Sequence, residues 1–241
     1  PSLYGQGSIL VISQSGESLD TLMALRYAKK LGLNTNAIVN VKGSTIDREV
    51  NYSLHTNVGP EIGVASTKSF TAQLLVLFLI AISLGKKFNN LKIDEIEEYI
   101  KYINMLPGAI AQMLEIENQI ISTAQNIKNS KSIIFLGRGF LYPLALEGAL
   151  KLKELSYIHA EGFAAGEMKH GPIALIEDNM PVIMFLISDG LEDKSISNLQ
   201  EAYSRGAKII LIADKICIEK ASFAHLKIEI PEFNDQFKSI L

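Results

Sequence analysis

The 241-residue sequence has little cysteine, no run of basic residues and no apolar stretch of membrane-spanning length. Its one cysteine, Cys217, cannot form an internal disulfide, which favours a reducing compartment and predicts a cytoplasmic protein. We expect this thiol to be inert rather than nucleophilic. With 23 Lys and Arg against 26 Asp and Glu, the net charge of -3 gives no indication of a nucleic-acid partner.

The most apolar run, LLVLFLIAISL at residues 74–84, is shorter than the roughly 20 residues that cross a bilayer. We therefore expect no membrane association. The run belongs to a long helix predicted at about 62–85, and its composition predicts that this helix is buried on all sides.

Apolar strand-like runs alternate with helical patterns along the chain, which is typical of an α/β protein with parallel strands covered on both faces. The predicted strands are 8–13, 36–41, 52–57, 132–137, 181–188, 208–214 and 226–231. An amphipathic helix is predicted between the first two strands, from Ser18 to Leu31, ending at Gly32.

Two blocks of the sequence can be superimposed at one constant shift. At this shift Gly16 pairs with Gly190 and Gly32 pairs with Gly206, with strand, turn, helix and strand in the same order. An internal duplication of one α/β unit explains this match. The second block has an extra opening strand, 132–137, whereas only the first continues into a long helix, so we expect a chain truncated at both ends.

The pattern predicts a first domain at 1–85, a helical connector at 86–130 and a second domain at 131–241. Apolar residues recur at helical spacing in the connector, and Pro107 is expected to divide it into two helices.

The loop SQSGES follows the first predicted strand and opens a helix, where free N–H groups and the helix dipole favour an anion. Ser13, Ser15 and Ser18 add hydroxyl groups, Gln14 adds an amide, and Gly16 allows a close approach of the backbone. The loop therefore predicts a phosphate-binding turn.

A helix N-cap is the alternative interpretation, but it accounts for only one of these serines. A phosphate would repel Glu17, so we expect its side chain to point away. Asp189 takes the place of Ser15 in the second unit, and a carboxylate there would exclude phosphate. One unit is expected to keep the anion site and the other to have lost it.

A second polar cluster, GPEIGVASTKSF at 59–70, follows the third predicted strand and faces the same edge of the sheet. Ser66 and Thr67 could cap the next helix or bind a ligand, and both interpretations remain open. Lys68 fits a solvated surface charge or a ligand contact.

Glu147, Lys151 and Glu154 share one narrow arc of a helix that is otherwise rich in Leu, Ala and Gly. Such a stripe is often a solvated face. Here the helix starts at the carboxyl edge of a strand, and the small residues Ala145 and Gly148 predict close packing around it, which favours proton transfer.

The segment that follows, AEGFAAGEMKHGP at 160–172, is expected to be a loop, and His170 near its end is flanked by glycine and proline. This histidine could be structural, exposed, or suited to opening a sugar ring. No metal-ligand spacing and no cysteine–histidine cluster is found, so we expect chemistry without a metal or cofactor.

These motifs together resemble the isomerase region of the glutamine–fructose-6-phosphate aminotransferases, which contains two sugar isomerase (SIS) domains. The resemblance covers nearly the whole chain and rests on SQSGES, PEIGVASTKSF and LGRGFLYPLALEGALKLKELSYIHAEGFAAGEMKHGP. It implies two flavodoxin-like units with parallel sheets in a three-layer αβα arrangement. It also implies a reaction that converts fructose-6-phosphate to glucosamine-6-phosphate.

The resemblance further implies a role for each matching residue. It places the sugar phosphate on Ser13, Gln14, Ser15 and Ser18, and the sugar on Ser66 and the Val64 backbone. Glu154 would move a proton between C1 and C2 with Lys151 nearby, and His170 would open the ring from a neighbouring subunit, which implies a homodimer. A stand-alone double-SIS isomerase or deglycase and a non-catalytic phosphosugar sensor are the alternatives.

The family's amino-terminal glutaminase domain, the opening loop of its first SIS domain and its carboxyl-terminal tail with the Schiff-base lysine have no counterpart in the sequence. We therefore expect that this polypeptide by itself does not form glucosamine-6-phosphate from glutamine.

Overall fold

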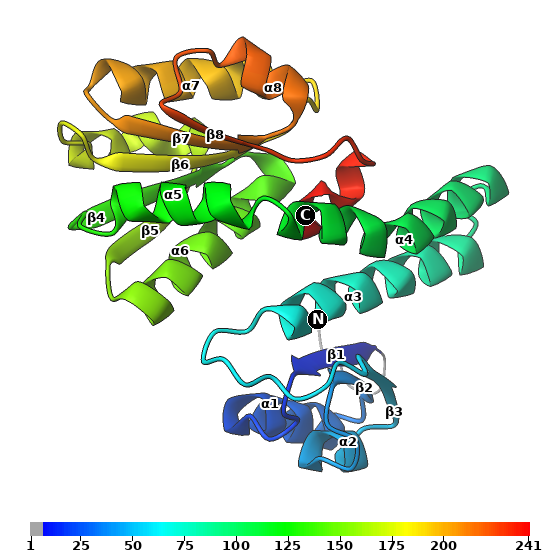
Figure 1. The fold of residues 1–241 in the computed structure, drawn as a ribbon. Helices are drawn as coiled ribbons and strands as arrows, with labels where there is room; N and C mark the ends of the chain where they lie inside the picture. The colour runs from blue at the N-terminus through cyan, green and yellow to red at the C-terminus, as the bar shows by residue number, and fades with distance from the viewer. Residues whose placement is uncertain (1–6) are drawn as a thin grey trace. The chain divides into compact units, whose positions relative to one another are not determined.

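The computed structural model describes residues 7–241, so the first six residues of the predicted first domain lie outside the described part. The chain forms two compact units, Pro1–Ile96 and Glu97–Leu241 (Figure 1). The boundary between them falls inside helix α4 (Ile93–Leu114), in the predicted connector.

The first unit contains a parallel three-stranded sheet in the order β1-β2-β3. Its strands are β1 (Ser8–Ser13), β2 (Asn34–Val39) and β3 (Tyr52–His55). Helices α1 (Leu19–Lys30) and α2 (Thr45–Glu49) cover one face of the sheet. The shared core is Val11, Leu22, Leu25, Ala37, Val39 and Ile46. On the other face Leu10 and Ile12 remain partly exposed. The helix predicted from Ser18 to Leu31 is confirmed as α1.

Helix α3 (Lys68–Lys87) begins later than expected and is not buried on all sides. Only Ser69 and Ile82 are buried in it, whereas Leu79 and Leu84 are 43% and 47% exposed, so that prediction is wrong. An apolar composition shows that the side chains of a helix favour burial, but it does not show whether other elements of the fold cover them. By length and composition alone, α3 is the one helix in residues 7–241 that could cross a membrane. A single helix of this kind is weak evidence for a membrane span.

Pro107 does not divide two helices, contrary to our expectation. It lies inside α4, which continues to Leu114. Only Glu115 and Ile116 separate this helix from α5 (Glu117–Ile127). A proline in a helix removes one hydrogen bond and crowds the preceding turn. The amphipathic pattern on both sides of Pro107 is continuous, and the helix accommodates the proline.

The second unit contains a parallel five-stranded sheet in the order β5-β4-β6-β7-β8. The strands are β4 (Ser132–Gly137), β5 (His159–Ala164), β6 (Pro181–Leu186), β7 (Lys208–Ala213) and β8 (Leu226–Glu229). Alternate residues of β4 enter separate cores, with Ile133 and Phe135 packed against α5 and α6 (Tyr142–Ser156). Ile134 and Leu136 share the other core with α7 (Glu192–Ser204) and α8 (Lys215–Lys220). The predicted three-layer αβα arrangement is confirmed here (Figure 1).

Strand β5 was missed, because the segment 160–172 was expected to be a loop. Its sequence, HAEGFA, has no β-branched residue and only one of the aromatic residues Phe, Tyr and Trp, Phe163, so it lacks the composition that marks a strand. Gly162 explains the composition, since a Cβ there would lie 2.8 Å from the backbone oxygen of Ala145 in α6. The close approach of helix and strand therefore requires glycine, and β5 forms the edge of the sheet beside β4.

The strand positions support the internal duplication. Strand β7 starts at Lys208 and β2 at Asn34, which is the same separation in sequence as that between Gly190 and Gly16. Strands β8 and β3, which start at Leu226 and Tyr52, are separated by the same number of residues. The last residues of the two strands in each pair are separated by this number as well. In the second unit β6 lies between β7 and the extra strand β4.

Candidate functional site

The SQSGES loop joins the carboxyl end of β1 to α1, and its own hydroxyl groups hold it. The Ser13 and Ser18 hydroxyl oxygens lie 3.0 Å apart, and the Gly16 N–H donates to Ser13 Oγ over 3.0 Å. The Glu17 N–H donates to Ser15 Oγ over 3.2 Å. Gly16 has a φ of 67°, a left-handed conformation that glycine adopts readily. The result is a tight turn with three hydroxyl groups at the start of a helix.

The N-cap alternative does not explain this loop. Ser18 occupies the N-cap position of α1, but its side chain makes no capping hydrogen bond and meets Ser13 instead. The backbone oxygen of Gln14 accepts a hydrogen bond from the Asn40 N–H over 3.1 Å, which ties the loop to the end of β2. The loop is thus anchored to the sheet as well as to the helix.

Glu17 turns towards α2, in agreement with the expectation that it points away from the loop. Its carboxylate oxygen Oε1 accepts a hydrogen bond from the Thr45 N–H over 2.8 Å. This bond and a second one from the Thr45 side chain lower the pKa of Glu17. Glu17 is therefore ionised at neutral pH, with its charge directed to the start of α2.

The second polar cluster of the first unit is organised by Glu61, which the sequence reasoning missed. Glu61 accepts hydrogen bonds from the Thr67 N–H over 2.6 Å, the Thr67 hydroxyl over 3.1 Å and the Ser66 hydroxyl over 3.2 Å. The nearby Ser69 and the hydrogen bonds from Thr67 and Ser66 lower the pKa of Glu61 to about 2. The Glu61 carboxylate therefore lies at the N-terminus of α3. The Ser66 and Thr67 hydroxyl groups donate to this carboxylate, and the Thr67 side chain does not cap the helix.

The remaining predicted residues of this cluster lie in the same connection as Glu61 or at the start of α3. Val64 is 89% exposed, and its backbone is part of the connection between β3 and α3. The Lys68 ammonium donates to the backbone oxygen of Pro60 over 2.8 Å. Lys68 is exposed, which agrees with a solvated surface charge, and it also has a partner within the loop.

The equivalent loop of the second unit is filled by its own carboxylates. The Leu191 N–H donates to Asp189 over 2.9 Å, and the Gly190 N–H donates to Glu192 over 2.7 Å. These amides are therefore already paired with negative charges. The same edge also carries a buried ion pair, in which the Lys238 ammonium lies 3.0 Å from an Asp214 carboxylate oxygen.

The predicted charged stripe forms on α6. The Lys151 ammonium lies 2.6 Å from Glu154 Oε2 and 3.5 Å from Glu147 Oε1, and about a quarter to a third of each side chain is exposed. Burial opposes the charge on Lys151, but the hydrogen bond and charge of Glu154 and the charge of Glu147 outweigh it and raise the pKa of Lys151. The stripe is a connected ion network and not three independent surface charges.

The helix that carries the stripe packs closely on the sheet, as its small residues predicted. Ala145 and Ala149 are buried, and a Cβ at Gly148 would lie 3.0 Å from the Phe135 ring. The charged arc is therefore fixed by a core that admits no larger side chains.

His170 ends the short helix η2 (Ala165–His170) and is exposed. Gly171 follows it with a φ of 148°, and η3 (Pro172–Leu175) continues the turn. Its neighbour Lys169 pairs with Glu201 of α7 over 2.6 Å. Arg138, which the sequence reasoning missed, also fixes α7, where it donates to the buried Ser195 and Asn198.

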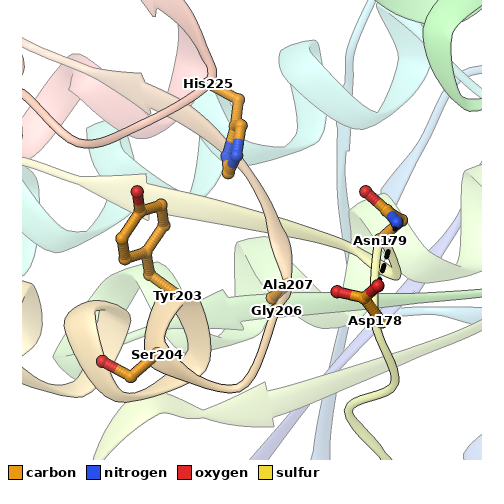
Figure 2. A pocket seen from close by; sticks show the side chains of 7 residues that line it. All are labelled: Asp178, Asn179, Tyr203, Ser204, Gly206, Ala207 and His225. Carbon is orange, nitrogen blue, oxygen red and sulfur yellow. Dashed lines mark hydrogen bonds between the residues drawn. The ribbon is translucent and has the colours of Figure 1, made fainter.

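A solvent-open hollow lies on the second unit before β6, β7 and β8 begin, away from the carboxyl ends of the strands (Figure 2). Figure 2 shows Tyr203 and His225 on one side and Asp178 and Asn179 on the other. No predicted site residue lies in this hollow. Among residues 7–241 no group of three or more His, Cys, Asp or Glu is placed to hold a metal ion.

Comparison with known proteins gives a consistent result. A family model described as "SIS domain" matches residues 7–83 and 126–239. The chain is 49% identical, over 93% of its length, to the glutamine–fructose-6-phosphate aminotransferase (isomerizing) of Brucella abortus, and 51% identical, over 90%, to that of Bradyrhizobium diazoefficiens. It spans 38% and 36% of these relatives.

A solved structure gives a similar match at the level of the fold. The C-terminal domain of glucosamine-fructose-6-phosphate aminotransferase from Francisella tularensis superimposes with a TM-score of 0.93 and 39% identity. The match covers 97% of this chain and 66% of that structure.

Proposed function

The chain belongs to the SIS domain family, and from this premise we propose that it is a phosphosugar-binding ketose–aldose isomerase unit. We propose further that it is the isomerase part of a glutamine-dependent amidotransferase that converts fructose-6-phosphate to glucosamine-6-phosphate. The observation that carries this proposal is the 49% identity to an aminotransferase of that name across 93% of the chain. We also propose a cytoplasmic location.

The phosphate group is assigned to the SQSGES loop. Ser13, Ser15 and Ser18 bring three hydroxyl groups to the start of α1, and Gln14 adds an amide. Such a helix start offers N–H donors and a positive partial charge to an anion. The second unit supports the assignment by contrast, because its equivalent loop already pairs its amides with Asp189 and Glu192.

The proton transfer is assigned to the stripe on α6. In this proposal Glu154 removes a proton from C1 or C2 of the open-chain sugar and returns it to the other carbon. The Lys151 ammonium lies 2.6 Å from Glu154 Oε2 and holds this carboxylate in place on α6. His170 assists ring opening, and Ser66 and the Val64 backbone hold the sugar.

We propose a homodimer in which His170 of each protomer serves the neighbouring protomer. The exposure of His170 at the end of η2 is compatible with such a role. Sedimentation velocity of the purified chain tests the assembly, and a monomer at micromolar concentration would contradict it.

Binding is tested by calorimetric titration of the chain with fructose-6-phosphate. Ser15→Asp gives the loop the residue of the second unit, and we expect repulsion of the phosphate to abolish detectable binding. Ser83→Asp introduces the same charge on an exposed position of α3 and serves as the control. Binding to Ser15→Asp with unchanged affinity would show that the phosphate lies elsewhere.

Proton transfer is tested by incorporation of solvent deuterium at C1 of fructose-6-phosphate, the carbon next to the C2 carbonyl, followed by NMR. Because a general base typically contributes a factor of about 10² to 10⁴, Glu154→Gln should reduce the exchange rate at least about a hundredfold and leave binding intact. An exchange rate equal to that of the unmodified chain would remove Glu154 from this role.

A further inference from the structure

The start of helix α2 contacts the SQSGES loop at three points. The Thr45 N–H donates to the Glu17 carboxylate over 2.8 Å, and the Ile46 N–H donates to the Gly16 backbone oxygen over 2.9 Å. The third contact is steric, because Ser44 fills the space where a side chain at Gly16 would lie. Ser44 and Ile46 are 4% and 0% exposed, so this part of the loop rests on a packed surface.

The charge on Glu17 makes this arrangement informative. A carboxylate within an anion-binding loop weakens binding by repulsion, at a distance where Coulomb interactions are still felt. Its hydrogen bond to the Thr45 N–H lowers the pKa of Glu17, so the charge is present at neutral pH. The carboxylate also satisfies an N–H group at a helix start, which has no partner within its own helix.

We propose that Glu17 is a positioning residue for phosphate binding, which fixes the SQSGES loop on the start of α2 through the Thr45 N–H. The gain from holding Ser15 and Gly16 in the binding conformation exceeds the loss from repulsion. This inference rests on the proposed function, because it takes the loop to be the phosphate site.

The two possible effects of Glu17 have opposite signs, which gives a direct test. Glu17→Gln and Glu17→Ala remove the same charge, but only glutamine keeps an oxygen that can accept from the Thr45 N–H. If repulsion dominates, both variants bind fructose-6-phosphate more tightly. The positioning role predicts that Glu17→Ala raises the Kd roughly threefold to tenfold, in the range expected for losing one hydrogen bond, and that Glu17→Gln partly restores affinity.

A second variant tests the partner of Glu17. Thr45→Pro removes the N–H group while keeping a φ that suits the first residue of a helix, and Ser44 already has the extended backbone that precedes proline. We expect the same loss of affinity, and no additional loss when Glu17→Ala is combined with it. Asp20→Asn, in the first turn of α1, removes a nearby charge without touching α2 and should leave binding unchanged or slightly tighter.

Hydrogen exchange at Thr45 provides a readout that needs no ligand. Exchange of this amide should accelerate in Glu17→Ala while the urea midpoint of unfolding changes little. Binding by the unmodified chain, with equal or tighter binding by Glu17→Ala, would overturn this inference alone. Failure of the unmodified chain to bind fructose-6-phosphate would overturn the proposed function and this inference with it.

Discussion

Gly16 shows how a single residue sets the shape of the candidate phosphate loop. Its φ of 67° lies in the left-handed region, and a Cβ there would lie 2.0 Å from the Ser44 hydroxyl oxygen. Backbone conformation and lack of space therefore both require glycine at this position.

We predict that Gly16→Ala lowers the free energy of unfolding by about 1–3 kcal/mol and weakens phosphosugar binding. Urea unfolding followed by circular dichroism measures the first effect. Gly43→Ala is the matched control, because Gly43 has a φ of 74° but open space around it. The control should show only the backbone strain, about 1 kcal/mol. Equal losses in the two variants would show that Ser44 does not restrict position 16.

Individual residues of the candidate site were predictable where the signal is local. The serines of the SQSGES loop and the stripe of Glu147, Lys151 and Glu154 could be found from spacing alone, and the structure places the latter three in one ion network. Their functional roles remain predictions. Arg138 was missed because its partners are distant in sequence, such as Asn198, 60 residues away. Glu61 was missed although Ser66 and Thr67 are only five and six residues away, because they contact it through the conformation of a loop, which follows no helix or strand spacing.

At the scale of elements, the start of α3 depends on a carboxylate from the preceding loop. The pKa of Glu61 falls from an ordinary 4.5 to about 2 through the nearby Ser69 and the hydrogen bonds from Thr67 and Ser66. A group with a lowered pKa in the folded state stabilises the fold above its unfolded pKa. This contribution is lost as the pH falls from about 4.5 towards 2.

We predict that the first turn of α3 loosens in this pH range before the sheets unfold. Hydrogen exchange of the Thr67 amide measures it, with protection expected at pH 5 and a progressive loss below. Glu61→Gln should make the exchange far less sensitive to pH between 4.5 and 2. A Thr67 amide whose protection does not change over this interval in the unmodified chain would refute the role of Glu61.

Prediction of elements succeeded where period and composition agree, as in the apolar strands and in α1. It failed for β5, because Gly162 and the alanines serve the close contact with α6 and hide the strand pattern. It failed again for α3 and at Pro107, since burial and the tolerance of a proline depend on neighbours that no local window contains.

At the scale of the whole chain, the α/β class and the duplication could be predicted because they repeat. Matching glycines and strands at one constant shift define two related units, and the boundaries of β2 and β7 and of β3 and β8 agree with that shift. The division into 1–85, 86–130 and 131–241 remains a proposal. The two compact units meet within α4, where a continuous helix gives the sequence no composition change to mark a boundary.

The duplication gives the central claim an internal control. Residues 13–18 and their counterparts 187–192 occupy the same position in their units, but only the second loop pairs its amides with Asp189 and Glu192. If the first loop is the phosphate site, a phosphosugar must bind residues 13–18 and not residues 187–192.

The most direct measurement is an NMR titration of the isotope-labelled chain with fructose-6-phosphate, observing the backbone amides. We predict saturable shifts for Ser15 and Gly16, with no change at Gly190 or at His225 in the hollow of Figure 2. Shifts confined to Gly190 or His225, with those of Ser15 and Gly16 unchanged, would contradict the account.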